Sequence, residues 1–168
     1  MRIYGSIDEF QTNLGHVRKW MRSGQAIAAA RDLPEGVAYS MGDSLTFWNT
    51  LPSDLADGRF IGHRRYHTVF APVGPMAVQV AAKAVLTVAE SYDDTTDREC
   101  FEMPKMTEDD GSTSDVRLVE VPAGGVLILE EDEAWRVPAT SGASSGEETS
   151  SPVTVLHVTV EGFTFPNK

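Results

Sequence analysis

The chain has 168 residues, of which 25 are acidic and 14 basic, so its formal net charge at neutral pH is −11. Hydrophobic residues make up 41% of the sequence, which is enough to form the core of one domain and excludes an intrinsically disordered chain. This acidic balance repels the phosphates of nucleic acids and anionic lipids. We therefore expect no nucleic-acid partner.

The cysteine content and the apolar segments of the sequence indicate in which cellular compartment the protein is expected. Cys100 is the only cysteine, so neither an intrachain disulfide nor a cysteine-rich zinc site can form. The N-terminus has no apolar stretch of the secretory type. The longest mainly apolar run, near 76–89, is interrupted by Gln79 and Lys83 and is too short to cross a bilayer. We expect a cytoplasmic protein without membrane insertion.

The first 34 residues predict helices. Ser6 and Glu9 have the spacing of a capping box. Apolar side chains then recur at helical spacing and form one stripe, with Trp20 at its margin: Phe10, Leu14, Val17 and Met21. We expect Gly24 to end this helix, and the alanine-rich segment 25–31 to form a second short one.

From residue 35 onward, short β-prone segments alternate with turns rich in Gly, Pro and Asp. These segments are 37–40, 45–49, 59–71, 77–81, 84–91, 116–121, 126–129, 135–137 and 153–160. Because no regular helices interleave, they predict an antiparallel sandwich or barrel. The expected organisation is a single domain over 1–168, with a helical part at 1–34, a β-barrel at 35–168 and a flexible exposed loop at 141–152.

Several short motifs, spread over nearly the whole chain, carry a family pattern. They are Ile3-Tyr4-Gly5, Leu33-Pro34-Glu35-Gly36 followed by Gly42-Asp43, the strand from Phe60 to Phe70, Ser91-Tyr92-Asp93-Asp94 continuing to Phe101, and Val121-Pro122-Ala123-Gly124 before the next strand. In this order and spacing they resemble the YhcH/YjgK/YiaL family, which includes the TabA- and EbgC-type proteins.

The resemblance implies a fold and a metal site. The implied fold is a cupin-like double-stranded β-helix with one or two N-terminal helices packed outside. The implied activity lies in sugar or sialic-acid metabolism, with a divalent metal in the barrel mouth. The Glu and His of a Glu-x-His strand and a second His further along the chain would hold that metal. Strand residues at i and i+2 share a face, and mixed nitrogen and oxygen donors suit zinc and similar metals.

The sequence departs from this pattern at the metal ligands. The family's Glu falls on Ile61 and its second His on Trp135, so only His63 remains of the three expected ligands. We therefore predict a degenerate member with no metal and no catalytic residue, whose interior is plugged by apolar side chains. The positions that line the former site are Ile61, His63, Tyr66, Thr68, Phe70 and Trp135.

A substitute metal site stays open as an alternative. His63 and His67 are four residues apart in the predicted strand 59–71, so both can face the barrel interior. If the last strand points its even-numbered side chains outward, His157 also faces inward. Three imidazoles can hold a divalent metal such as zinc. The alternative function is thus a metal-dependent sugar isomerase, epimerase or lyase built on His63, His67 and His157.

The other chemical features have simpler explanations. The acidic runs 130–133 and 108–110 are typical of solvated turns. Cys100 is expected to be an inert thiol, because Asp97 and Glu99 offset the charge of Arg98. The aromatic side chains nearest the expected barrel mouth are Trp48, Phe70 and Trp135.

The sequence keeps the motifs of the family's fold but has lost two of its three expected metal ligands. This combination favours a non-catalytic pseudoenzyme. We expect it to act as a structural or interaction subunit of a larger protein assembly, with other proteins or with a second copy of itself as partner. A cytoskeletal and an organellar assembly are both open. The alternatives are the metal-dependent sugar enzyme and a metal-free sugar-binding module that uses Trp135 and Tyr66.

Overall fold

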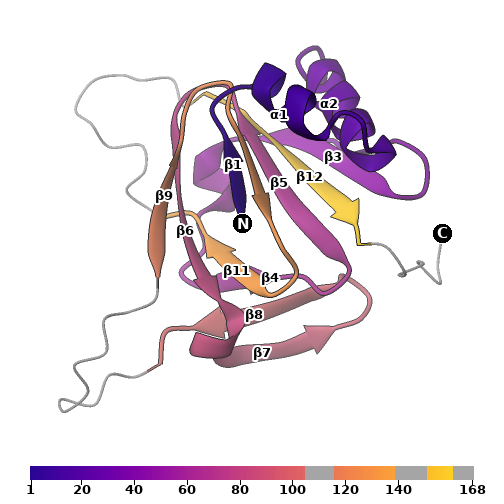
Figure 1. The fold of residues 1–168 in the computed structure, drawn as a ribbon. Coiled ribbons are helices and arrows are strands. Elements are labelled where there is room, and N and C mark those ends of the chain that lie inside the picture. Colours follow the sequence, from indigo (N-terminus) through magenta and orange to yellow (C-terminus); the bar gives the residue numbers. More distant parts are fainter. Residues whose placement is uncertain (105–115, 139–150, 161–168) are drawn as a thin grey trace.

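The computed structural model describes residues 1–104, 116–138 and 151–160. Within these ranges the protein is mainly β, with two six-stranded antiparallel sheets and two N-terminal helices (Figure 1). The predicted fold class, a β-sandwich with helices packed outside it, is therefore confirmed. The predicted polar turn at 108–110 and most of the predicted loop at 141–152 lie outside the described residues.

Each sheet mixes strands from distant parts of the chain. The first sheet has the order β1 (Arg2–Tyr4), β10 (Val126–Leu129), β5 (Tyr66–Pro72), β12 (Val153–Thr159), β3 (Leu45–Thr50) and β2 (Tyr39–Ser40). The second has the order β7 (Thr87–Asp93), β8 (Arg98–Glu102), β4 (Phe60–Gly62), β11 (Glu133–Arg136), β6 (Met76–Ala82) and β9 (Arg117–Val121). Two short 3-10 turns, η1 (Pro52–Leu55) and η2 (Lys83–Val85), connect strands.

The helices are α1 (Ile7–Leu14) and α2 (Arg18–Ala30). The Ser6 hydroxyl accepts the Glu9 N–H at 3.1 Å, which confirms the predicted cap, while the Glu9 carboxylate accepts the N–H of Gly5 at 2.6 Å. In the ranges that the structure covers, no helix has both the length and the apolar character to cross a bilayer.

The position of Gly24 corrects the predicted helix boundary. Gly24 lies inside α2, and the break between the helices comes earlier, around Gly15. A Cβ on Gly24 would lie 1.5 Å from Nε2 of Gln11 on α1. Gly24 therefore allows the two helices to approach closely, rather than ending one of them.

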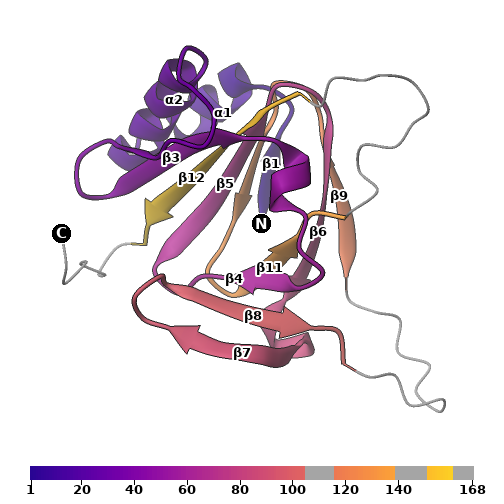
Figure 2. The same cartoon turned by 180° about the vertical axis from the view of Figure 1, so that it is seen from behind.

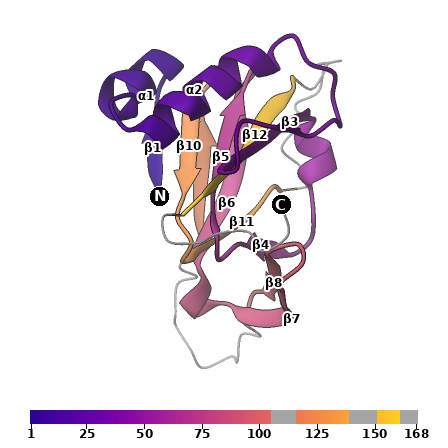
Figure 3. The same ribbon diagram turned by 90° about the vertical axis from the view of Figure 1, so that its right-hand side faces the viewer.

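The elements form three layers: the helices, the first sheet and the second sheet (Figure 3). One core fills the space between the helices and the first sheet, and includes Phe10, Trp20, Ile27, Phe47 and Leu156. A second core fills the space between the sheets, and includes Phe70, Val78, Leu127, Trp135 and Val155. On β12, Leu156 thus faces the helices and Val155 the second sheet, because successive strand side chains point to opposite faces.

The predicted strand 59–71 is two strands in different sheets. β4 pairs with β8 and β11, whereas β5 pairs with β10 and β12, as the view from behind shows (Figure 2). The chain bends between them at His63–Arg65. The Asp97 carboxylate holds this bend by accepting the backbone N–H groups of Arg64 at 3.3 Å and Arg65 at 3.0 Å. The bend changes which residues share a face.

Candidate functional site

A cavity of about 350 Å³ lies between the two sheets; we call it the inter-sheet cavity. Its lining comes from β3, η1 and the loop after it, β4, β8, β11 and β12. The polar and aromatic residues in this lining are Trp48, Asp54, Asp57, His63, Thr96, Arg98, Trp135 and His157, and Ile61 also lines it. The predicted apolar plug therefore does not fill the interior. Phe70 is buried and is not part of this lining, and its ring lies edge-on to Trp135 at 4.9 Å between ring centroids.

Two positions predicted for metal ligands lie side by side. Ile61 and Trp135 are directly opposed in the β4–β11 register, and both belong to the core between the sheets. His63 follows and lines the same cavity. Since neither an alkyl chain nor an indole offers a metal-ligating atom, these residues do not fit the divalent metal that the resemblance implies.

His63 and His157 come together in the cavity wall. Their ring centroids are 4.5 Å apart, and Tyr66 stacks on His157 at 4.9 Å. Thr68 is buried and lies opposite His157 in the β5–β12 register, so it too faces the space between the sheets. Of the six positions predicted to line the interior, three line this cavity: Ile61, His63 and Trp135. A fourth, Tyr66, contacts the cavity wall by stacking on His157.

The tautomer of His63 follows from its partner. Nδ1 lies 2.6 Å from the backbone carbonyl of Asp97. Because a carbonyl only accepts, Nδ1 carries the proton and Nε2 keeps its lone pair. Burial lowers the pKa of His63, and burial together with the neighbouring His63 holds the pKa of His157 well below its ordinary value. Both rings are therefore neutral at pH 7.

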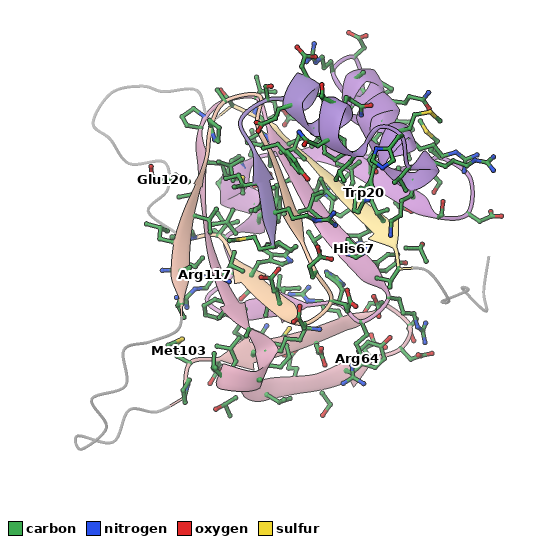
Figure 4. The ribbon with its side chains drawn as sticks, in the orientation of Figure 1. Trp20, Arg64, His67, Met103, Arg117 and Glu120 are labelled. Atoms are coloured by element: carbon green, nitrogen blue, oxygen red, sulfur yellow. The ribbon has the colours of Figure 1, made fainter. Side chains whose placement is uncertain are left out.

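His67 does not join them, so the structure does not assemble the alternative three-histidine site. His67 lies on the helix-facing side of β5, beside Trp20 (Figure 4), and their ring centroids are 5.4 Å apart. The reason is the bend at His63–Arg65, which ends β4 in the second sheet before β5 begins in the first. A site made of His63, His67 and His157 is therefore not assembled.

His67 instead lies beside an acidic turn. Its Nδ1 is 2.9 Å from a Glu130 carboxylate oxygen, although the contact is not aligned as a hydrogen bond. Burial lowers the pKa of His67, and the charge of Glu130 opposes that shift. Glu131 also lies near, but Lys19 is 3.5 Å from Nε2 of His67, and Arg2 pairs with Glu130 at 3.0 Å. Lys19 and Arg2 therefore already place two positive charges beside this cluster.

The run 130–133 is only partly the solvated turn that we expected. Glu131 and Asp132 are exposed. Glu130 pairs with Arg2, and the buried Glu133 carboxylate accepts the Glu130 N–H at 3.0 Å. The outer members of the run are therefore held by protein partners.

Arg98 is the functional side chain that sequence reasoning missed. It lies on β8 and lines the cavity, where Nη2 is 3.3 Å from a carboxylate oxygen of Asp57. The carboxylates of its chain neighbours have other partners: Asp97 accepts the backbone N–H groups of Arg64 and Arg65, and Glu99 pairs with Arg64 and Lys83. The alternation of side chains along the strand could have revealed the position of Arg98. Arg98 shares a face with Cys100, and Cys100 lies directly opposite Ile61, which lines the cavity.

Two buried N–H groups of the cavity wall have no acceptor among the residues that the structure describes. They are Nε of Arg98 and Nε1 of Trp135. A buried donor without a partner costs about 1–3 kcal/mol. The side chains that carry these donors line the cavity together with His63 and Trp48, and a ligand would reach the two N–H groups only after the side chains shift, because neither atom is exposed.

Comparison with models of known protein families finds no match for this chain.

Proposed function

We propose that the inter-sheet cavity binds a small polyhydroxylated ligand of the sugar or sugar-acid class, without a metal and without turnover. The observation that carries this proposal is the pair of unmatched donors, Nε of Arg98 and Nε1 of Trp135, in the wall of one cavity. A ligand rich in acceptor oxygens would satisfy both of them.

The rest of the lining suits the same ligand class. The aromatic faces of Trp48 and Trp135 provide apolar surface for the C–H face of a sugar ring, and His63 can accept a hydroxyl proton through Nε2. The guanidinium of Arg98 favours a carboxylate on the ligand, although Asp57 balances part of its charge. A volume of about 350 Å³ lies at the lower end of the range for small-molecule sites.

The proposed absence of turnover follows from the side chains at the positions of the expected ligands. Ile61 and Trp135 replace a carboxylate and an imidazole, and within the described part of the chain no third ligating group joins His63 and His157. We therefore propose a pseudoenzyme that keeps a binding cavity.

The YhcH/YjgK/YiaL relationship belongs to the same proposal. Its support is the motif order along the chain and the register that puts Ile61 opposite Trp135 beside His63. The hypothesis that the protein is a structural or interaction subunit of a larger assembly does not depend on the cavity, and it stays a prediction. The expected cytoplasmic location, in a cytoskeletal or organellar assembly, also stays a prediction. Co-purification from the native source tests it.

Tryptophan fluorescence tests the proposed ligand class. A Trp20→Phe background removes the tryptophan that lies outside the cavity and leaves Trp48 and Trp135 as reporters. We would titrate this protein with glucose, glucuronate and N-acetylneuraminate. The expected result is a saturable change, stronger for the two acids. A flat response to all three sugars overturns the proposal.

Two variants and a control localise the response. Trp135→Phe keeps an aromatic ring but removes the indole N–H, and Arg98→Gln removes the cation while Arg59 remains beside Asp57. Both should weaken binding by about ten-fold, the loss expected for one hydrogen bond to a buried or charged group. Arg18→Gln, an exposed change on α2, should have no effect. Equal binding by all three variants contradicts the proposed site.

A further inference from the structure

A second cavity lies on the opposite side of the first sheet. It has a volume of about 420 Å³ and shares no lining residue with the inter-sheet cavity. We call it the helix-side cavity, because its walls come from the start of α1, the end of α2 and the adjoining ends of β5, β10 and β12. Its apolar lining includes Ile7, Ile27, Ala71, Val73 and Val126.

The uncharged polar side chains in this wall are already satisfied. The amide of Asn49 donates to the carbonyls of Ala30 at 2.5 Å and Leu33 at 3.1 Å, and its oxygen accepts from Thr154 at 2.8 Å. These bonds leave the Asn49 amide without a free donor for a ligand.

The backbone in the same wall is likewise paired. Val73 N–H bonds to the Pro152 carbonyl at 3.0 Å, and Gly124 N–H bonds to the Pro72 carbonyl at 2.9 Å. A cavity with few unmet polar groups holds ordered water poorly and favours an apolar occupant.

Arg31 is the one charged residue among those that line this cavity. It follows the last residue of α2, its side chain is exposed, and it belongs to the cavity lining. Within residues 1–104, 116–138 and 151–160, its guanidinium makes no ion pair and no hydrogen bond. A cation without a partner at the rim of an apolar cavity is complementary to a ligand with an apolar body and one anionic end.

We infer that the helix-side cavity binds an aliphatic carboxylate, with the alkyl chain against Ile7, Ile27 and Val126 and the carboxylate on Arg31. A cavity of about 150 Å³ accommodates one benzene, so the volume here has room for an alkyl chain of at least about eight carbons. This site is independent of the proposed sugar cavity, because the two lie on opposite faces of the first sheet.

Calorimetric titration of the full chain with octanoate and with 1-octanol tests both parts of the inference. The intact protein should bind octanoate more tightly than the alcohol. Arg31→Ala should weaken octanoate binding by about ten-fold and leave octanol binding unchanged, since the lost contact is one hydrogen-bonded charge pair. Arg31→Lys should restore part of the preference for the acid. Arg18→Ala, which removes the same charge elsewhere on α2, should change neither affinity.

Filling the cavity tests the location of the alkyl chain. Ile27→Trp should abolish binding of both probes, with thermal unfolding and near-ultraviolet dichroism used to establish that the variant is folded. Ala71→Leu, a smaller filling change on β5, serves if Ile27→Trp is unfolded. Arg98→Gln in the inter-sheet cavity should leave octanoate binding intact. No octanoate binding by the intact protein, equal binding by the filled variants, or equal preference for acid and alcohol overturns the inference.

Discussion

Ile61 on β4 and Trp135 on β11 are directly opposed cross-strand partners in the wall of the inter-sheet cavity. In the pattern that the sequence resembles, these two positions carry a glutamate and a histidine. His63, the remaining ligand of that pattern, lines the same cavity. The arrangement of the three positions thus suits a metal site, while two of the three side chains do not.

Restoring the two ligands should restore metal binding. The double variant Ile61→Glu with Trp135→His is expected to bind zinc at one ion per chain, because it adds a carboxylate and an imidazole beside His63. Loss of the buried indole should also lower the stability of the protein by a few kcal/mol, roughly the cost of a large-to-small core change. Zinc content after dialysis and calorimetric titration measure the gain.

The control for this experiment is the pair Ile61→Leu with Trp135→Phe, which changes the same positions without adding ligands. It should take up no zinc at the site. A folded double variant with Glu and His that also takes up no zinc would contradict the proposed correspondence between these positions and the family's ligands.

Asp97 should be a strong determinant of stability, because its buried carboxylate holds the bend between β4 and β5. It accepts the backbone N–H groups of Arg64 and Arg65 and the Tyr92 hydroxyl, the last at 2.6 Å. Asp97→Asn keeps a residue type that tolerates the observed φ of +50° but replaces an acceptor with a donor. We expect a loss of about 2–3 kcal/mol in the free energy of unfolding by urea. Asp93→Asn, an exposed change nearby, should cost less.

The same variant should change the titration of Tyr92. Burial and the hydrogen bond to Asp97 raise the pKa of the Tyr92 phenol to about 12. Without the carboxylate, the pKa should fall toward the ordinary value near 10. Ultraviolet absorbance at alkaline pH follows phenolate formation, and an unchanged Tyr92 titration would show that burial alone sets it.

The two neutral histidines predict a pH dependence of stability. Burial lowers the pKa of both His63 and His157 in the folded protein, so the unfolded chain binds more protons below about pH 6.5. Stability from these groups is therefore complete above the unfolded pKa and is lost as the pH falls through it toward the folded pKa. The slope is at most about 1.4 kcal/mol per pH unit for each histidine.

Thermal unfolding between pH 7 and pH 5 measures this effect. The Tm of the intact protein should fall across that window, and His157→Gln should flatten the decrease because it removes one of the buried histidines whose pKa is lowered, the others being His63 and His67. His16→Gln is the matched control, since His16 is exposed on the segment between the helices. An equal flattening by both variants would refute the assignment to the buried pair.

Gly62 is expected to tolerate no side chain. A Cβ there would lie 2.5 Å from Cε of Lys83 and 3.0 Å from the Phe101 ring. Lys83 is held at this point by the carbonyl of His63 at 2.7 Å and the Glu99 carboxylate at 2.6 Å. Gly62→Ala should therefore cost about 2 kcal/mol, in the range for overpacking. Gly58→Ala, where nothing lies within 4 Å of the added Cβ, should be nearly neutral in the same urea titration.

Local signals account for what the sequence predicted well. The Ser6 cap depends on residues within one helical turn, and the β-prone segments depend on composition and turn residues, so both could be recognised in place. The bend at 63–65 could not, because the group that holds it is Asp97, which is distant in the sequence and whose role depends on the pairing of β4 with β8. Gly24 is a similar case, since its reason is a side chain on another helix.

The same difference between local and distant determinants holds for the candidate site. The interior position of His157 followed from alternation along one uninterrupted strand. The placement of His67 was wrong because alternation was carried through a bend. Arg98 was missed because its charge was summed with that of its chain neighbours, although adjacent residues on a strand face different surroundings.

β3 has Trp48 on one cavity and Asn49 on the other, and β12 has His157 on one and Thr154 on the other, so two adjoining strands of the first sheet separate the two compartments. Because successive side chains of these strands serve different cavities, a substitution at one position alters the lining of one compartment and leaves that of the other in place.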